Sequence, residues 1–265
     1  MNELVLLKLG GSLITDKTRP YVARHDKLAD LAAQIASARA RGSGMRLILG
    51  HGSGSFGHTA AKAYGTRKGV RGAEGWKGFA EVHYQAAQLN HFVMDALHGA
   101  GLPALAFPPS GAVIASDGKV SAWETTPIRM ALENGILPVV YGDTVFDEAR
   151  GGTILSTEDL FQHLARQLRP GRILLAGLEA GVWADFPART RLLSGISPRS
   201  REDLRAGVGG SHGADVTGGM ESKVGLMLEL VQEIDRLEAL IFSAEEPGVL
   251  GRALSGDAPG TRISA

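Results

Sequence analysis

Short apolar runs alternate with longer amphipathic segments along this chain, and the alternation limits which folds it can adopt. Runs that are apolar at nearly every position predict strands buried on both faces, as in a parallel sheet. They occupy residues 4–9, 45–49, 104–107, 136–141, 173–176 and 239–242. Apolar residues at helical spacing predict amphipathic helices over residues 25–41, 79–99 and 220–237. Strands that alternate with helices indicate an α/β fold, in which an open, mainly parallel sheet is covered on both faces.

The size and composition of the chain argue against several classes of protein. With 265 residues, 44% of them hydrophobic, the chain can bury a large core, and we expect residues 1–265 to form a single domain. Lysine plus arginine and aspartate plus glutamate number 28 each, so no net charge attracts the chain to nucleic acid or to an anionic membrane. Cysteine is absent and no apolar run is long enough to span a bilayer, so we expect a cytoplasmic protein.

Glycine is unusually frequent, and it collects where apolar runs end. The chain has 36 glycines, well above the average frequency of about 7%. The main clusters cover residues 8–17, 50–58 and 215–223, here called the first, second and third glycine clusters. Because ligands of open α/β sheets bind at the carboxyl ends of the strands, these clusters predict loops that converge on one ligand.

The first glycine cluster has the composition of a phosphate-binding loop. Gly10 and Gly11 allow backbone N–H groups to approach an anion, and Lys8, Ser12 and Lys17 add side-chain donors. The spacing matches neither a Walker A loop nor the GxGxxG pattern of dinucleotide-binding proteins. A glycine turn flanked by solvated lysines is the alternative interpretation.

The second glycine cluster, GHGSGSFGH, repeats this arrangement after the second predicted strand. Residues 52–55 offer consecutive N–H groups, and Gly57 and His58 lead into the start of a predicted helix, whose N-terminus favours anions. His58 is a candidate donor to a phosphate oxygen, with a structural histidine as the alternative. The same alternative holds for His51, which can cap the end of the strand.

The third glycine cluster opens the last predicted helix, and Lys223 lies one turn into it, directed toward the helix N-terminus. Together the clusters hold more cationic donors than one phosphate needs, which favours a chain of phosphates with phosphoryl transfer between two of them. Mg²⁺ normally bridges the nucleotide phosphates in such reactions. Asp143 and Asp159 are candidates for orienting the lysines or holding this ion, and either can instead be a helix or turn acid.

In their order along the chain, these motifs resemble the isopentenyl phosphate kinases of the amino-acid kinase superfamily. The resemblance covers nearly the whole chain and rests on KLGGSLITDK, GHGSGSFGH, AAKAYG, LPALAFPPSG, VVYGDTVFDE, DVTGGMESK and EEPGVLGRAL with the later GTRI. It implies a three-layer α/β/α sandwich with an N-terminal acceptor-binding lobe and a C-terminal nucleotide-binding lobe, usually assembled as a homodimer. It also implies transfer of the γ-phosphate of ATP to isopentenyl phosphate in the presence of Mg²⁺.

The resemblance implies roles for individual residues. Lys8, Lys17 and His58 would be catalytic, with Lys17 stabilising the transferring phosphoryl group and His58 contacting the acceptor phosphate. The ATP-binding set would be Lys8, Leu9, Gly10, Gly11, Ser12, Gly54, Asp185, Gly219 and Lys223. The acceptor-binding set would be Ser53, His58 and Thr157, with Phe79, Val82, His83 and Ala86 on a helical face facing the apolar tail. Each of these last four positions can also be an ordinary core position. The resemblance itself assigns no residue as a metal ligand.

Two departures from the family pattern accompany the resemblance. Ser53 stands where the family motif has a glycine, and GLEAGVW at residues 177–183 replaces an acidic nucleotide loop, although Asp185 follows closely. Contacts to the base and ribose therefore stay unassigned. The alternative functions are a related kinase of a phosphonate such as fosfomycin and a nucleotide-binding protein of the same fold without turnover.

Overall fold

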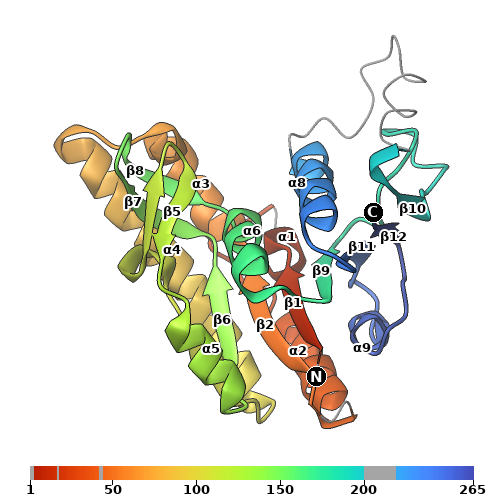
Figure 1. The fold of residues 1–265 in the computed structure, drawn as a ribbon. Helices are drawn as coiled ribbons and strands as arrows, with labels where there is room; N and C mark the ends of the chain where they lie inside the picture. Colours follow the sequence, from red (N-terminus) through yellow and green to blue (C-terminus); the bar gives the residue numbers. More distant parts are fainter. Residues whose placement is uncertain (1–2, 17, 42–43, 200–218) are drawn as a thin grey trace.

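The central sheet of the protein is built mainly from parallel strands (Figure 1). The computed structural model describes residues 3–16, 18–41, 44–199 and 219–265. Within these residues the sheet has eight strands in the order β10-β12-β11-β9-β1-β2-β6-β3, and only β11 and β12 pair antiparallel. The strands are β1 (Leu4–Leu9), β2 (Arg46–His51), β3 (Ala104–Ala106), β6 (Leu137–Tyr141), β9 (Arg172–Gly177), β10 (Gly195–Ile196), β11 (Glu238–Ser243) and β12 (Thr261–Ile263).

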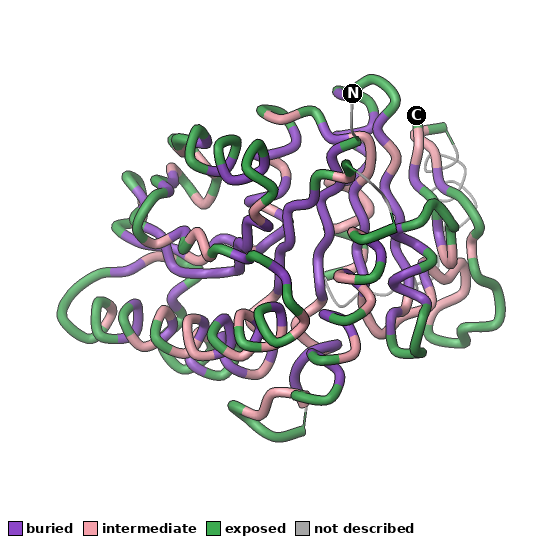
Figure 2. The backbone as a smooth tube through the Cα atoms, turned by 90° about the horizontal axis from the view of Figure 1, so that it is seen from below, coloured by how far each residue is buried: buried purple, intermediate pink, exposed green. Residues whose placement is uncertain are grey.

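Helices cover both faces of this sheet and give the expected three layers. Alternate side chains of β1 enter different cores, because Val5 and Leu7 pack on one face and Leu4 and Leu6 on the other. The first core includes side chains of α2 (His25–Arg41), α4 (Gly72–Gly99) and α9 (Val249–Leu254). The second includes α5 (Thr126–Glu133), α6 (Thr157–Leu168) and α8 (Gly219–Glu233). Figure 2 shows the buried backbone running between exposed helical turns.

A second, four-stranded sheet lies beside α4 and was not predicted. Its order is β5-β4-β7-β8, and the strands are β4 (Val113–Ser116), β5 (Lys119–Trp123), β7 (Asp143–Asp147) and β8 (Gly151–Leu155). The buried Asp147 carboxylate accepts hydrogen bonds from the backbone N–H groups of Asp117, Gly118, Ala149 and Arg150. Because these bonds join the turn between β4 and β5 to that between β7 and β8, one side chain fixes two hairpins together.

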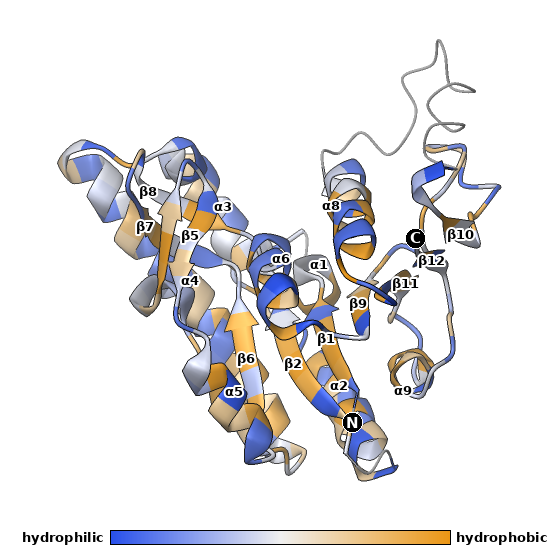
Figure 3. Ribbon diagram, viewed as in Figure 1, coloured by the Kyte–Doolittle hydropathy of each residue, from blue (hydrophilic) through white to orange (hydrophobic). Residues whose placement is uncertain are grey.

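The six predicted strands of the central sheet are confirmed, and their apolar character is visible in β2 and β6 (Figure 3). The helix predicted over residues 25–41 has these bounds in the structure. The last predicted helix ends earlier, at Glu233 rather than Leu237. Arg236 has a φ of 61°, in the left-handed region that no helical residue adopts, so the chain turns there to enter β11.

Candidate active site

A cleft of about 980 Å³ opens where the carboxyl ends of β1, β2 and β9 meet. Its walls include residues of the first and second glycine clusters, the start of α6, the residues after β9 and the start of α8. The ends of β1 and β2 are followed directly by two short helices, α1 (Gly11–Ile14) and α3 (Gly54–Tyr64). The fold thus brings the three predicted glycine clusters, as far as they are described, to one edge of the sheet.

The first and second glycine clusters touch each other through their backbones. Gly52 N donates to Leu9 O at 3.0 Å, and a Cβ added to Gly11 would lie 2.6 Å from Gly54 Cα. Gly54 itself has a φ of 49°, which disfavours any side chain there. Leu9 takes part only through its backbone, since its side chain is buried in the core below the cleft. The glycines are therefore needed first for contact between two loops, which leaves the cleft floor free of side chains.

Ser53 packs its side chain against the same glycine cluster. Its Cβ lies 2.5 Å from the position that a Cβ on Gly57 would occupy. Gly57, one turn further along α3, therefore provides the room for Ser53, and both residues line the cleft. The hydroxyl thus stands at the cleft wall beside His58.

Lys8 is held at the cleft by a carboxylate that the sequence interpretation missed. The Lys8 Nζ lies 3.0 Å from Glu158 Oε1, and only 9% and 11% of the two side chains are exposed. Burial opposes ionisation of Glu158, but the positive charges of Lys8 and Lys223 outweigh it and lower the pKa of this carboxyl. Lys8, Glu158 and Lys223 all line the cleft. The acid between two predicted phosphate-binding lysines is thus Glu158, whose only signal in the sequence is its place at the start of a helix.

The two carboxylates proposed for this role, Asp143 and Asp159, have other hydrogen-bond partners than the lysines, although Asp159 also lines the cleft. Asp143 is fully buried and accepts hydrogen bonds from Thr144 N at 2.8 Å and from His83 Nδ1 at 3.1 Å. Asp159 accepts hydrogen bonds from Ser156 N and Ser156 Oγ, and so completes a capping box at the start of α6. The prediction that they orient lysines is therefore wrong. Asp143 pairs with His83, and Asp159 caps the start of α6.

His51 is a buried structural residue at the end of β2. Its ring stacks on Tyr141 with centroids 5.3 Å apart, and its Nε2 lies 3.2 Å from Asn90 Oδ1. Burial, partly opposed by hydrogen bonds to Asn90 and Gly52, lowers the pKa of His51 to about 4, so the ring is neutral at pH 7. The Thr157 hydroxyl donates to His51 O at 2.6 Å, which ties the start of α6 to the end of β2.

His58 lines the cleft and is solvent-exposed there. Enclosure by the cleft and the positive charges of Arg67 and Lys8 lower the pKa of His58. A neutral imidazole keeps one N–H group as a donor. Arg67 was not predicted; it lines the same region and lies 3.7 Å from Asp159.

Only one residue of the predicted acceptor-tail face lines this cleft. Val82 does so, together with Ile154 and Leu155 of β8. Phe79 instead packs edge-on against Trp76, Ala86 is buried against the core, and His83 is paired with Asp143. Apolar side chains of both α4 and β8 thus line the cleft, and β8 belongs to the sheet that the sequence did not predict.

The other end of the cleft is formed around α8 and the residues after β9. Gly219, Met220, Ser222, Lys223 and Leu226 line it from α8, and Leu178, Glu179, Phe186 and Arg189 line it from the segment after β9. Asp185 is not among these lining residues, because its carboxylate accepts hydrogen bonds from the backbone N–H groups of Thr190 and Arg191. Asp185 thus fixes a turn within residues 185–191, and its contact with ATP stays a prediction. Lys17 and the start of the third glycine cluster lie outside the described residues.

Sequence and structure comparisons identify known proteins that this chain resembles over nearly its whole length. The sequence profile of the Amino acid kinase family matches residues 3–243. An isopentenyl phosphate kinase of Methanothermobacter thermautotrophicus is 36% identical over 273 residues, covering 98% of this chain and 99% of that protein. The isopentenyl phosphate kinase of Haloferax volcanii is 34% identical and covers 98% of both chains. A solved structure of isopentenyl phosphate kinase superposes with a TM-score of 0.83 at 33% identity, covering 98% of this chain and 100% of that one.

Proposed function

This chain belongs to the amino acid kinase family, and we propose that it transfers the γ-phosphoryl group of ATP to isopentenyl phosphate. A phosphate oxygen of the acceptor forms a bond to the γ-phosphorus, the bond from that phosphorus to the β,γ-bridging oxygen breaks, and isopentenyl diphosphate and ADP leave. The observation that carries the proposal is the shared cleft, whose lining includes the cationic side chains of Lys8 and Lys223 together with His58 and Ser53.

The proposed roles follow from charge and position. Phosphoryl transfer needs in-line placement and positive charge around the equatorial oxygens more than covalent help from the protein. Lys8 and Lys223 supply that charge, with Glu158 between them as the group that fixes Lys8. The acceptor phosphate is itself the nucleophile and is largely deprotonated at neutral pH. His58 therefore acts as a hydrogen-bond donor to the acceptor phosphate, and Lys17 keeps its predicted role at the transferring group.

Mg²⁺ enters this proposal with the nucleotide. No three His, Asp or Glu side chains gather into a metal site within residues 3–16, 18–41, 44–199 and 219–265. Mg²⁺ is commonly held by substrate phosphates and water with few protein ligands. The cleft fits that mode, because its glycine-lined floor leaves room for phosphates and the ion together, and because its charged side chains suit binding of phosphate oxygens.

An apolar wall supports the choice of acceptor. Val82, Ile154 and Leu155 line the same cleft as His58, so one cleft offers both polar and apolar side chains to an acceptor with an anionic head and an apolar tail. A phosphonate such as fosfomycin would use His58 but has no long apolar tail. The full-length relatives named above are isopentenyl phosphate kinases, which disfavours the phosphonate and the non-catalytic alternatives.

The test is an ADP-release assay with ATP and Mg²⁺ on isopentenyl phosphate, dimethylallyl phosphate and fosfomycin. We expect turnover of the isoprenoid phosphates, and turnover of fosfomycin alone would refute the proposal. His58→Ala should lower kcat/KM for the acceptor by about 100-fold or more, because it removes a donor aimed at the reacting phosphate. His98→Ala, at an exposed position near the end of α4, is the matched control and should leave the rate unchanged.

The assembly and location of the protein are part of the same proposal. We propose a homodimer in the cytoplasm, in which residues 1–265 of each chain form one domain, since the central sheet takes strands from both halves of the chain. No helix in the described part of the chain is long and apolar enough to cross a membrane. Light scattering of the purified protein tests the dimer, and a single unfolding transition tests the single domain.

A further inference from the structure

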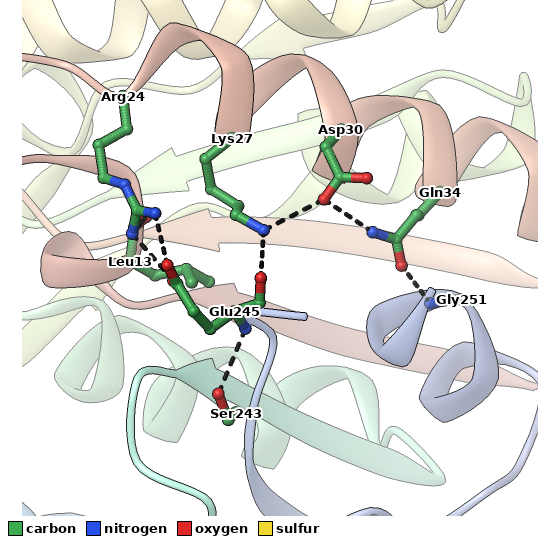
Figure 4. Close-up of polar contacts among 8 residues, drawn as sticks. All are labelled: Leu13, Arg24, Lys27, Asp30, Gln34, Ser243, Glu245 and Gly251. Atoms are coloured by element: carbon green, nitrogen blue, oxygen red, sulfur yellow. Dashed lines mark hydrogen bonds and ion pairs between the residues drawn. The ribbon is translucent and has the colours of Figure 1, made fainter. Parts of the chain in front are cut away.

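A polar network joins the start of α2 to the residues after β11, and Figure 4 shows Arg24, Lys27 and Ser243 meeting at Glu245. Arg24 immediately precedes α2, and its Nη1 and Nη2 donate to the two carboxylate oxygens of Glu245 at 2.9 and 2.5 Å. Lys27, one turn into α2, is buried and donates from Nζ to Glu245 O at 2.6 Å. Two segments separated by 221 positions in sequence are thus held together at both the side chain and the backbone of one residue.

Arg24 also holds α1, the short helix that follows β1. Its Nη1 donates to Leu13 O at 3.0 Å, and its backbone N–H donates to Ile14 O at 2.9 Å. A helix of four residues has little stability of its own, so contacts from outside decide its orientation. Gly11 and Ser12 of α1 line the cleft, which places Arg24 directly behind the phosphate-binding surface.

Hydrogen bonds also fix Glu245 to the carboxyl ends of β9 and β11, at the end of the cleft that the proposed function assigns to the nucleotide. Its N–H donates to Ser243 Oγ at 3.2 Å, and the preceding Ala244 N donates to Gly177 O at 3.0 Å. Gly177 of β9 and both Ile241 and Phe242 of β11 line the cleft. A rigid chain of bonds therefore runs from α1 through Arg24 and Glu245 to the carboxyl ends of β9 and β11.

We propose that Arg24 and Glu245 are positioning residues for phosphoryl transfer, which fix the phosphate-binding helix α1 relative to the nucleotide end of the cleft. The inference rests on the proposed function, because it assigns the two ends of the cleft to phosphates and nucleotide. Neither residue lines the cleft, so both act through α1 and β11 rather than by touching a substrate. A displacement of about 1 Å in such a site can lower a rate about 100-fold.

The protein contains a matched control at the far end of the same sheet. Arg172 donates to both carboxylate oxygens of Glu3 at 2.9 and 2.8 Å, and also to Ala253 O at 2.9 Å at the end of a helix. Glu3 and Glu245 have the same side-chain exposure of 44%. Arg172 begins β9 and Glu3 precedes β1, so this pair repeats the bonding of Arg24 and Glu245 at the amino ends of the strands, away from the cleft.

The experiment compares Glu245→Gln with Glu3→Gln. Positioning predicts that Glu245→Gln lowers kcat/KM for ATP about tenfold or more and weakens ADP binding by a similar factor, whereas Glu3→Gln changes each by less than about twofold. A purely structural role predicts equal falls in melting temperature and no difference in kinetics, and that result would overturn the inference. Arg24→Lys keeps the charge but cannot span Leu13 O and both carboxylate oxygens, so it should give a smaller loss of the same kind.

Failure of this inference can be distinguished from failure of the proposed function. Calorimetric titration with ADP needs no acceptor, so it reports on α1 and β11 even if isopentenyl phosphate is not turned over. Weaker ADP binding by Glu245→Gln with normal binding by Glu3→Gln supports the positioning role whatever the acceptor. Equal ADP affinity of the wild type and both variants contradicts it.

Discussion

Gly11→Ala is the substitution that most directly tests how the two phosphate loops are built. The added Cβ would lie 2.6 Å from Gly54 Cα and 3.3 Å from Gly52 C, both backbone atoms of the second glycine cluster. Ordinary van der Waals contact begins at about 3.4 Å, so one loop has to move by about 1 Å. No flexible side chain is present at these contacts to absorb the shift, and the backbone of α1 or of α3 must take it.

This geometry sets the expected size of both effects. Overpacking of a close-packed contact costs about 1 to 3 kcal/mol in the free energy of unfolding. In a domain of this size that corresponds to a fall in melting temperature of roughly 2 to 10 °C. A movement of about 1 Å between the donor and acceptor loops should also lower kcat/KM by about 100-fold. Because a 100-fold loss of rate corresponds to about 2.7 kcal/mol, the losses of activity and of stability should be of similar size in free energy.

The assay combines ADP release with thermal unfolding, and Gly177→Ala is the control. Gly177 also lines the cleft at a strand end, but a Cβ there would meet no atom within 4 Å, so its melting temperature should stay close to that of the wild type. If Gly11→Ala kept wild-type kcat/KM and melting temperature, backbone contact between the two glycine clusters would not be what requires glycine at position 11.

Two further predictions concern the buried ionisable side chains of Glu158 and His51. Glu158→Gln should lower the free energy of unfolding by about 3 to 5 kcal/mol, because it leaves Lys8 buried without its carboxylate, and a loss below about 1 kcal/mol in chemical denaturation would contradict the pairing. Stability should also fall as the pH drops from 6.5 to about 4, since the pKa of His51 is about 4 in the folded protein and 6.5 in the unfolded chain, which therefore binds the proton first. The loss from this group is about 3 kcal/mol, and His51→Asn should remove it in unfolding experiments across that pH range.

The layered fold could be predicted from the sequence because its signals are local. The apolar runs of β1, β2 and β9 are continuous, which indicates strands buried on both faces. The apolar residues of α2 repeat at helical spacing, which indicates a helix buried on one face. The second sheet gave a weaker signal. Phe146 in β7 is 50% exposed and Lys119 opens β5, so its strands lack the continuous apolar pattern of the central sheet.

The parts of the candidate site that consist of glycine-rich backbone could be predicted from the sequence. Contacts between side chains that are far apart in the sequence could not. The first and second glycine clusters follow strand ends, and parallel strands bring such ends to one edge of a sheet. An acidic residue, in contrast, gives no local sign of its partner. Asp143, Glu158 and Asp159 look alike in the sequence, yet one binds a histidine, one a buried lysine and one the start of its own helix.

The sequence by itself therefore determined the strands of the central sheet, the layers and the edge of that sheet at which a ligand can bind, because hydrophobic periodicity and glycine clusters act over a few residues. The tertiary structure decided which charges meet there. Lys8 and Glu158, or Arg24 and Glu245, are brought together only after the crossover connections have set the strand order. An ion pair depends on the final positions of two distant side chains, and periodicity along the chain specifies which face is buried but not which residue lies opposite.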